Sequence, residues 1–295
     1  MYRCEKRIKT NHTTLDMDII GVDVGGTKIG AGTVSGGKIE DHKVVDISPG
    51  SREEVTEQLL GAVESLFAST VDGIGIGIPG AIDQETGTVL KCPNVPSTPL
   101  WENIPLKKIV EEKFGVPMKM NNDANCFALG EKYFGQGKGY KNVVGLIIGT
   151  GCGAGIIADG RLVEGANCGA GEFGQIPFGE GVMEYWTSAQ FFKRKYGITG
   201  KEAFDLAESG GSKALEMFEE YGANLGRLLV IIRHAVDPEI VVLGGSVSKA
   251  FKYFEKPMRE ALKASPFAQA WKPLVVEPSS LEHVYVLGAA ALFMQ

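Results

Sequence analysis

GTGCGAGII at residues 149–157 matches GTKIGAGTV at residues 26–34, and this internal repeat decides the fold. Gly, Thr, Gly, Ala and Gly occupy the same places in both copies. An apolar run precedes each copy, at residues 19–24 and 143–148, and each copy continues into a second one. The pattern predicts a strand, a glycine turn and a second strand, built twice in one chain.

The glycines of these turns favour anion binding. Without a side chain, they let backbone N–H groups approach a ligand closely and point together, which suits phosphate. Two facing phosphate turns predict a nucleotide cleft between two lobes. The plain alternative is a pair of ordinary glycine hairpins.

The composition is that of a globular chain with about two domains. Of its 295 residues, 44% are hydrophobic and 22% are charged, and the 40 glycines are interpreted as turns and ligand loops. A net charge of −6 argues against a general nucleic-acid surface, and no apolar run approaches the roughly 18 residues of a membrane span. The five scattered cysteines form no C-x-x-C pair and indicate free thiols in a reducing compartment. We therefore expect a cytoplasmic protein that binds neither nucleic acid nor membranes.

Strands alternate with helices along the rest of the chain. The pattern predicts strands at residues 18–24, 28–34, 43–47, 72–78, 116–120, 142–148 and 240–243, with two more near the C-terminus. It predicts helices at residues 52–67, 104–114, 124–134, 183–196, 203–208, 213–236, 248–263 and 288–294. Ser51 and Glu54 form a capping-box pattern, and Asn103 is expected to cap its helix.

This duplicated β-β-β-α-β-α pattern predicts an α/β fold of two ribonuclease-H-like lobes with a cleft between them. We expect residues 17–123 with 288–295 to form a small N-terminal lobe. Residues 124–287 would form a large C-terminal lobe. Residues 1–16 are polar and lack the apolar core of a secretory signal, so we expect a flexible leader there.

Several short motifs follow one another in a fixed order: DVGGTK at residues 23–28, GIPG at 77–80, PN at 93–94, NNDAN at 121–125, GTGCG at 149–153, GEFG at 171–174 and GG at 244–245. In this order they resemble the actin, hexokinase and chaperone ATPase superfamily. More closely, the chain from residue 18 onward resembles the ROK family of bacterial sugar kinases (repressor, open reading frame, kinase). The resemblance implies an actin-like ATPase fold. It also implies transfer of the γ-phosphate of ATP, with Mg²⁺, to the 6-hydroxyl of a hexose.

The resemblance favours glucose as the sugar, because glucose is the commonest substrate of the family. Fructose, mannose, allose and N-acetylhexosamines remain alternatives, and family members are often homodimers or homotetramers. A sugar-sensing transcriptional regulator of the same family is a further alternative, but residues 1–16 are too few for a DNA-binding domain. A sensor without catalysis is disfavoured because Asp123 accompanies intact phosphate turns.

Phosphoryl transfer needs a cradle for the nucleotide phosphates, a cation and a base that orients the attacking hydroxyl. Asp23 ends a predicted strand beside the first turn, and one Asp with ATP oxygens suffices for Mg²⁺; a carboxylate that caps the turn is the alternative. Lys28 would compensate phosphate charge, or is simply solvated. The resemblance implies that Gly244 and Gly245 form the loop on the adenosine side. A plain turn from a strand to a helix is the alternative. The nucleotide-binding candidates are Asp23, Gly25, Gly26, Thr27, Lys28, Thr150, Gly151, Gly153, Gly244 and Gly245.

Asp123 follows a predicted strand and precedes a helix, a usual place for ligand chemistry in α/β sheets. The resemblance implies that it is the general base that accepts the proton of the sugar hydroxyl. An ordinary pKa near 4 would leave it ionised at neutral pH. An N-cap aspartate is the alternative, and one residue can serve both purposes. The sugar-binding candidates implied by the resemblance are Asn94, Asn122, Asp123, Glu172, Gln175 and Glu184, of which Glu184 has no defined role.

The chain departs from the family where many members bind structural zinc through a histidine and a cysteine cluster. Gln175 stands at the histidine position, and residues 176–184 contain no cysteine. Because tetrahedral zinc needs Cys or His ligands, we expect no zinc here. Instead, Ile176, Phe178 and Met183 are expected to pack where the metal would hold the loop.

Overall fold

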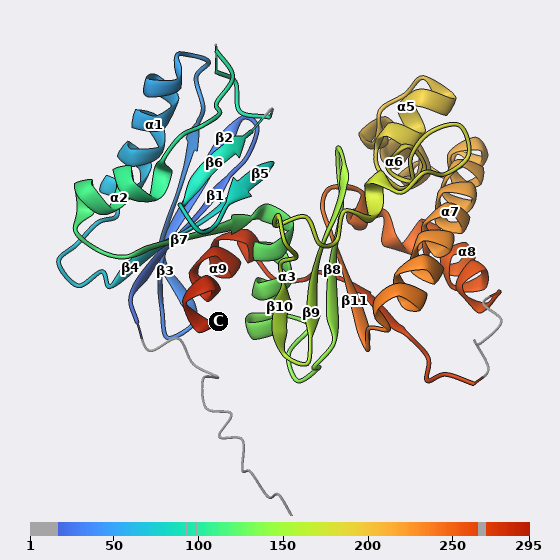
Figure 1. The fold of residues 1–295 in the computed structure, drawn as a ribbon. Coiled ribbons are helices and arrows are strands. Elements are labelled where there is room, and N and C mark those ends of the chain that lie inside the picture. Colours follow the sequence, from blue (N-terminus) through green and yellow to red (C-terminus); the bar gives the residue numbers. More distant parts are fainter. Residues whose placement is uncertain (1–16, 93, 98, 265–269) are drawn as a thin grey trace, which may run out of the picture.

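The computed structural model describes residues 17–92, 94–97, 99–264 and 270–295 (Figure 1). These residues form two lobes, each built on a five-stranded mixed sheet, so the predicted α/β fold of two lobes is confirmed. The leader predicted at residues 1–16 lies outside the described residues. Within the described ranges no helix is both long and apolar enough to span a bilayer.

The N-terminal sheet has the strand order β3-β2-β1-β4-β7. Its strands are β1 (Ile19–Val24), β2 (Lys28–Ser35), β3 (Lys38–Asp46), β4 (Gly73–Ile78) and β7 (Met118–Asn122). The first three pair antiparallel, whereas β1, β4 and β7 run parallel and therefore end at one edge. A small hairpin of β5 (Ala81–Asp83) and β6 (Thr88–Lys91), absent from the predicted elements, follows β4.

The C-terminal sheet repeats this arrangement in the order β10-β9-β8-β11-β12. Its strands are β8 (Val143–Ile148), β9 (Cys152–Ala158), β10 (Arg161–Val163), β11 (Ile240–Gly244) and β12 (Val275–Pro278). Again the first hairpin is antiparallel, and β8, β11 and β12 run parallel. The two halves of the chain therefore place their glycine turns at equivalent sheet edges.

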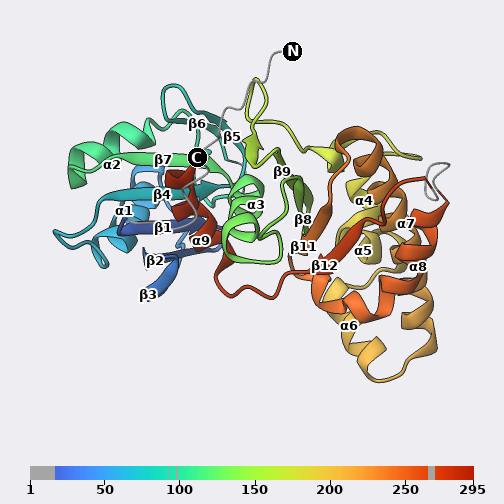
Figure 2. The same cartoon turned by 90° about the horizontal axis from the view of Figure 1, so that it is seen from below.

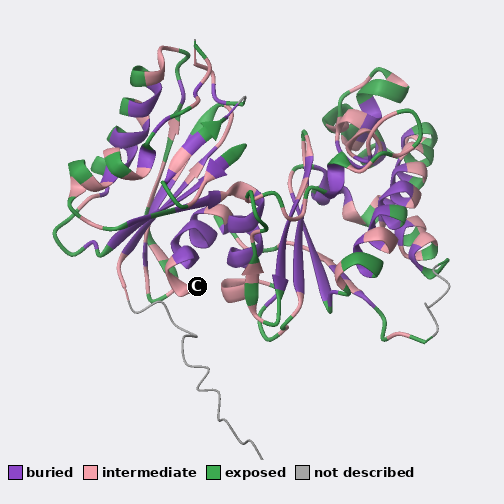
Figure 3. Ribbon diagram, in the orientation of Figure 1, coloured by how far each residue is buried: buried purple, intermediate pink, exposed green. Residues whose placement is uncertain are grey.

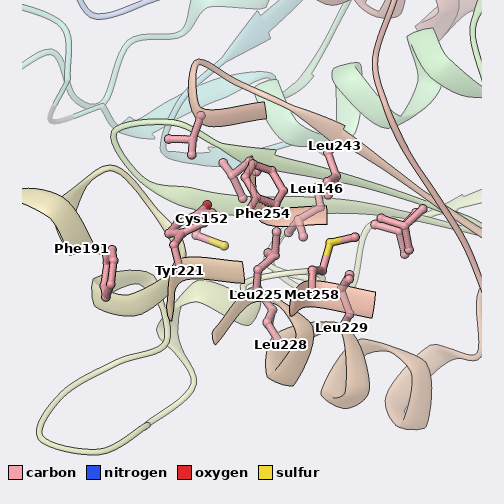
Figure 4. Close-up of a cluster of buried hydrophobic side chains, with 14 of the residues drawn as sticks. Leu146, Cys152, Phe191, Tyr221, Leu225, Leu228, Leu229, Leu243, Phe254 and Met258 are labelled. Carbon is pink, nitrogen blue, oxygen red and sulfur yellow. The ribbon is translucent and has the colours of Figure 1, made fainter. Parts of the chain in front are cut away.

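Helices cover both sheets. They are α1 (Arg52–Glu64), α2 (Leu106–Phe114), α3 (Asp123–Phe134), α4 (Glu184–Thr187), α5 (Gln190–Tyr196), α6 (Gly200–Glu208), α7 (Ser212–Val236), α8 (Phe251–Lys263) and α9 (Val284–Ala290), with 3₁₀ turns η1 (Phe173–Gln175), η2 (Val247–Ala250) and η3 (Ala291–Met294). The N-terminal sheet carries α1 and α2 on its outer face (Figure 1). Figure 4 shows Leu225 and Leu229 of α7 and Met258 of α8 in one buried cluster with Leu146 and Leu243 of the C-terminal sheet.

The helix pair α3 and α9 lies between the two sheets in both views (Figures 1 and 2), and its contact faces are buried (Figure 3). Glycine makes the close packing possible. A Cβ atom on Gly288 of α9 would lie 1.7 Å from Cys126 O of α3, and one on Gly21 of β1 would lie 2.1 Å from Val286 O. These glycines lie inside helices and strands, so the interpretation of the glycines as turns and ligand loops was incomplete.

The capping box of α1 is confirmed, since the Ser51 hydroxyl accepts a hydrogen bond from Glu54 N and the Glu54 carboxylate accepts one from Ser51 N. The cap predicted at Asn103 is wrong: this residue has φ +54, and α2 starts after Pro105, which has no capping side chain.

Two other predicted elements are wrong. The single helix expected over residues 183–196 is broken into α4 and α5 at Ser188, whose backbone is extended. The break has a tertiary cause, because the next residue, Ala189, donates its N–H to Gly149 O of the second turn. Near the C-terminus the described residues contain one strand, β12, where two were expected, and α9 begins at Val284 rather than at residue 288.

Candidate functional site

The two glycine turns of the repeat occupy equivalent places in the two lobes. The first joins β1 to β2, and the second joins β8 to β9, in the antiparallel hairpins that the repeat predicted. Thr27 and Thr150 are exposed at the tips. Both turns are therefore open to a ligand from the side of the parallel strand ends.

The first turn contains the cationic side chain of Lys28 and contacts the loop that contains Asn94. Gly25 N closes the turn on Lys28 O at 2.8 Å, and the Lys28 ammonium lies 3.7 Å from a carboxylate oxygen of Asp46. Both of these side chains are exposed, so the ion pair contributes little and leaves the ammonium available to phosphate. A Cβ atom on Gly26 would lie 3.0 Å from Asn94 O, which places the exposed Asn94 against the turn.

The second turn is held by Glu184 of α4. Its Oε2 accepts a hydrogen bond from Cys152 N at 2.9 Å, and its Oε1 accepts one from Gln190 Nε2 at 2.9 Å. A Cβ atom on Gly151 would lie 2.8 Å from Glu184 Oε2. This carboxylate, expected on the sugar side, thus lies directly against the backbone of the second turn.

Gly244 and Gly245, at the end of β11, lie beside the second turn. Gly245 has φ +85, and a Cβ atom there would lie 2.6 Å from Ile148 O. A Cβ atom on Gly244 would lie 2.5 Å from Cζ of Phe127. Neither position has room for a side chain, and Gly245 lies directly against the backbone of Ile148 and Gly149 at the start of the second turn.

Three carboxylates from distant parts of the sequence are linked electrostatically, because the charge of Asp123 acts on both Asp23 and Glu172. Desolvation, and then the charge of Asp123, raise the pKa of Asp23 from 3.8 to about 7. Desolvation also raises the pKa of Asp123, against the opposing effect of the hydrogen bond from Ala124 N. For Glu172 the pKa is raised by desolvation first, and then by Asp123 and Glu184. The expectation that Asp123 has an ordinary pKa therefore does not hold, because burial raises it.

Asp23 alone is the candidate ligand for a cation. A divalent ion near Asp23 would favour the charged carboxylate and offset the burial that raises its pKa. No group of three or more His, Cys, Asp or Glu side chains suited to a metal occurs in the part of the chain that the structure describes. A Mg²⁺ ion at Asp23 would accordingly need oxygens from a bound nucleotide, as expected for a site with one aspartate.

Asp123 is presented by the junction of β7 and α3. Asn122 is the N-cap of α3, with its Oδ1 accepting a hydrogen bond from Ala124 N at 2.9 Å, so the N-cap alternative for Asp123 is wrong. Asp123 is the first residue of the helix, and a Cβ atom on Gly153 of β9 would lie 3.6 Å from the Ala124 Cβ. The predicted base and the second hairpin are therefore neighbours.

The loop that replaces the zinc site is a short hairpin. Phe178 N donates to Gly181 O at 2.9 Å, and Met183 N donates to Ile176 O at 2.9 Å. Met183 is fully buried, Ile176 and Phe178 pack against the same core, and Phe178 meets Trp186 edge to face. The predicted apolar packing is confirmed. Gln175, exposed at the end of η1, stands just before this hairpin.

Sequence reasoning missed a set of polar side chains behind Asp123. Asn121, in the quoted NNDAN motif, is buried and hydrogen-bonds to Glu164 and Cys168 of a distant loop. Three asparagines within five residues are an unusual density of amides at a strand end. That density of amides is the signal that could have identified Asn121. Only Asn122 and Asp123 of this motif were named as site residues.

Comparison with known proteins connects this geometry to one family. The model of the ROK family matches residues 19–295. A glucokinase of Thermotoga maritima is 32% identical over 281 residues, which cover 82% of this chain and 87% of that protein. A xylose repressor of Caldicellulosiruptor bescii is 33% identical over 75% of this chain and 62% of its own length. The crystal structure of a ROK family glucokinase from Streptomyces griseus with glucose and AMPPNP superposes with a TM-score of 0.78, at 30% identity over 93% of this chain and 98% of that one.

Proposed function

The chain belongs to the ROK family of sugar kinases, and we propose that it transfers the γ-phosphate of ATP to the 6-hydroxyl of glucose. The observation that carries the proposal is the placement of Asp23 at the first glycine turn and of Asp123 beside the second glycine hairpin. Glucose is preferred because the glucokinases of Thermotoga maritima and Streptomyces griseus are similar along most of this chain. Fructose, mannose, allose and N-acetylhexosamines are the competing substrates.

Asp123 is the general base in this proposal. Its carboxylate would accept the proton of the 6-hydroxyl as the oxygen attacks the γ-phosphorus, with the leaving ADP in line. The pKa of Asp123 is raised by desolvation, which makes it a stronger base than a solvated aspartate while the hydrogen bond from Ala124 N keeps it from rising further. Closure of the lobes around both substrates would exclude water, which otherwise competes with the sugar hydroxyl.

Asp23 would hold Mg²⁺ together with ATP oxygens, and the ion would supply positive charge to the transferring phosphoryl group. Around it, the backbone of Gly25, Gly26 and Thr27 and the Lys28 ammonium would contact the phosphates from the first turn. From the second turn, Thr150, Gly151 and Gly153 form a neutral clamp. Gly244 and Gly245 would border the adenosine.

The sugar would lie between Asp123 and the loop that carries Glu172. Asn94, Asn122, Glu172 and Gln175 supply amide and carboxylate groups that suit a polyol, since each sugar hydroxyl both donates and accepts. Glu184 is assigned a different part from the expected one. Its Oε2 accepts a hydrogen bond from Cys152 N at the second turn and its Oε1 accepts one from Gln190 of α5, so it would position that turn for ATP.

An assay of ADP release over a panel of hexoses tests the proposal. We expect turnover with glucose and a lower kcat/KM with the competing hexoses. The Asp123→Asn variant keeps the side-chain shape and an acceptor for Ala124 N, but it cannot take a proton. Its kcat should fall by about 10²–10⁴-fold with glucose binding retained.

Asp159→Asn is the matched control, because Asp159 lies in the exposed turn after β9, at the end of that strand opposite the glycine turn. This variant should keep the wild-type kcat. Absence of turnover with every sugar would overturn the kinase proposal. Near-full activity of Asp123→Asn would overturn only the assignment of the base.

A further inference from the structure

Asn121 is a buried hub with four hydrogen-bonding partners, and its side chain is 1% exposed. Its Oδ1 accepts hydrogen bonds from Asn122 N at 2.8 Å, Asn125 Nδ2 at 2.8 Å and Cys168 Sγ at 3.1 Å. Its Nδ2 donates to Glu164 Oε1 at 2.8 Å. Only this orientation of the amide sets its oxygen against donors and its NH₂ group against a carboxylate.

The oxygen side of the amide fixes the junction of β7 and α3. It binds the backbone N–H of Asn122, the residue that caps α3 and precedes Asp123. It also binds Asn125, one turn into the helix. The direction in which the chain leaves the strand, and with it the direction of the Asp123 carboxylate, therefore depends on this one acceptor.

The NH₂ side holds the loop of residues 164–172, which ends at Glu172. Ala170 N closes this loop on Glu164 O at 3.2 Å. On its other flank the loop is pressed against β9, since a Cβ atom on Gly171 would lie 1.9 Å from Ala154 O. The loop is thus fixed to the C-terminal sheet by Gly171 and to the end of β7 by Glu164 and Cys168.

We propose that Asn121 is a positioning residue that sets the distance between Asp123 and Glu172 by joining the catalytic strand end to the sugar-side loop. The inference rests on the proposed kinase function. Asn121 would touch neither substrate. It acts through Asn122 on the base, and through Glu164 on the loop. A displacement of about 1 Å between the two carboxylates is enough to lower turnover by about 100-fold.

Exchanging the donor and the acceptor tests the hydrogen bond between Asn121 and Glu164, which we call the tether. Asn121→Asp keeps the oxygen that accepts from Asn122 N. It replaces the Nδ2 donor with a second carboxylate against Glu164, so the hydrogen bond between position 121 and the loop is lost. Glu164→Gln keeps an oxygen that accepts from Asn121 Nδ2. In the double variant the Gln at position 164 donates to the Asp at position 121, which restores the hydrogen bond with its polarity reversed.

We expect Asn121→Asp to lower kcat/KM for the sugar by about 10- to 100-fold, with KM for ATP within about 2-fold of wild type. Glu164→Gln should cost at most about 3-fold, and the double variant should return to within about 3-fold of Glu164→Gln. Asn142→Asp is the matched control for the added charge. Asn142 accepts a hydrogen bond from Asp159 N at the start of β8, the end opposite the glycine turn.

Alkylation of Cys168 by iodoacetamide, followed by peptide mass spectrometry, is a readout that does not depend on activity. Cys168 donates its Sγ hydrogen to Asn121, so release of the loop should speed its modification in Asn121→Asp, and the double variant should reverse this. A double variant no better than Asn121→Asp in either readout would overturn the tether. A wild-type enzyme without sugar turnover would instead overturn the proposed function, and the alkylation rates would still decide on the tether.

Discussion

Replacing Asp23 with Asn is expected to stabilise the ligand-free protein above neutral pH while it abolishes activity. The carboxylate at the end of β1 is desolvated, and the charge of Asp123 opposes its ionisation. These two causes raise its pKa to about 7. An asparagine has nearly the same shape and carries no charge, so it removes the cost of ionising a desolvated carboxylate, together with the ligand proposed for Mg²⁺.

The magnitude follows from the pKa. In the unfolded chain the Asp23 carboxyl ionises near its ordinary value of 3.8, whereas in the folded protein it keeps its proton up to about pH 7. Between these two values the folded state binds more protons, so the stability of the wild-type protein falls as the pH rises and then levels off above pH 7. At 1.36 kcal/mol per pH unit the full penalty is about 4 kcal/mol. This value is an upper limit for the gain, because a desolvated amide has a cost of its own.

Urea unfolding of both proteins at pH 5 and pH 8 measures the effect. The free energy of unfolding of Asp23→Asn, minus that of wild type, should grow by about 2.5 kcal/mol between the two pH values. Mg²⁺ with a non-hydrolysable ATP analogue should remove much of the pH dependence of wild type and leave that of the variant unchanged, because a bound cation favours the charged carboxylate.

Asp83→Asn is the control. Its carboxylate accepts hydrogen bonds from Thr86 and Glu85 in an exposed turn, and these bonds lower its pKa. Asp83 is therefore ionised in both the folded and the unfolded protein between pH 5 and pH 8, and the difference from wild type should stay constant over this range. A constant difference for Asp23→Asn as well would refute the reasoning that Asp23 carries a raised pKa.

Three further predictions concern the loop after β10. Gly171→Ala should destabilise the protein by more than about 3 kcal/mol in urea unfolding, because Gly171 has φ +95 and its Cβ atom would lie 1.9 Å from Ala154 O; a loss below about 1 kcal/mol would contradict this packing. Alkylation of Cys168 should inhibit sugar phosphorylation, because the bulky adduct must separate the loop from Asn121. The Cys168→Ser variant should resist the reagent. Equal sensitivity of the variant and the wild type would show that another cysteine is responsible. Metal analysis of the purified protein should find no stoichiometric zinc, and a zinc chelator should leave activity unchanged in excess Mg²⁺, whereas inhibition would show that the apolar hairpin does not replace the metal.

Local sequence rules predicted the parts of the fold that depend on neighbours in the chain. Ser51 and Glu54 satisfy each other within one helical turn, so their capping box is visible in the sequence and present in the structure. The strands around both glycine turns follow from apolar runs and were placed within a few residues. Near the C-terminus, two strands were expected before a helix that begins only at residue 288.

Packing changed that last prediction. The helix α9 already begins at Val284 and is buried against β1 and α3, and glycines such as Gly21 and Gly288 let the backbones touch. Nothing local marks these glycines as different from those in turns. The same limit applies to Glu184, which was a sugar-binding candidate by resemblance and had no defined role. Its hydrogen bond to Cys152 N joins residues 32 positions apart in the chain, which no local pattern indicates.

The order of residues was enough to predict two lobes with paired glycine turns, because the repeat of glycine motifs is visible along the chain. It also singled out Asp23, Asp123 and Glu172. Their raised pKa values came from the folded arrangement, because burial raises all three and the charge of Asp123 acts on Asp23 and Glu172, which are far from it in the chain. The partners of Asn121 were decided in the same way, because hydrogen bonds between a strand end and a distant loop leave no period in the sequence.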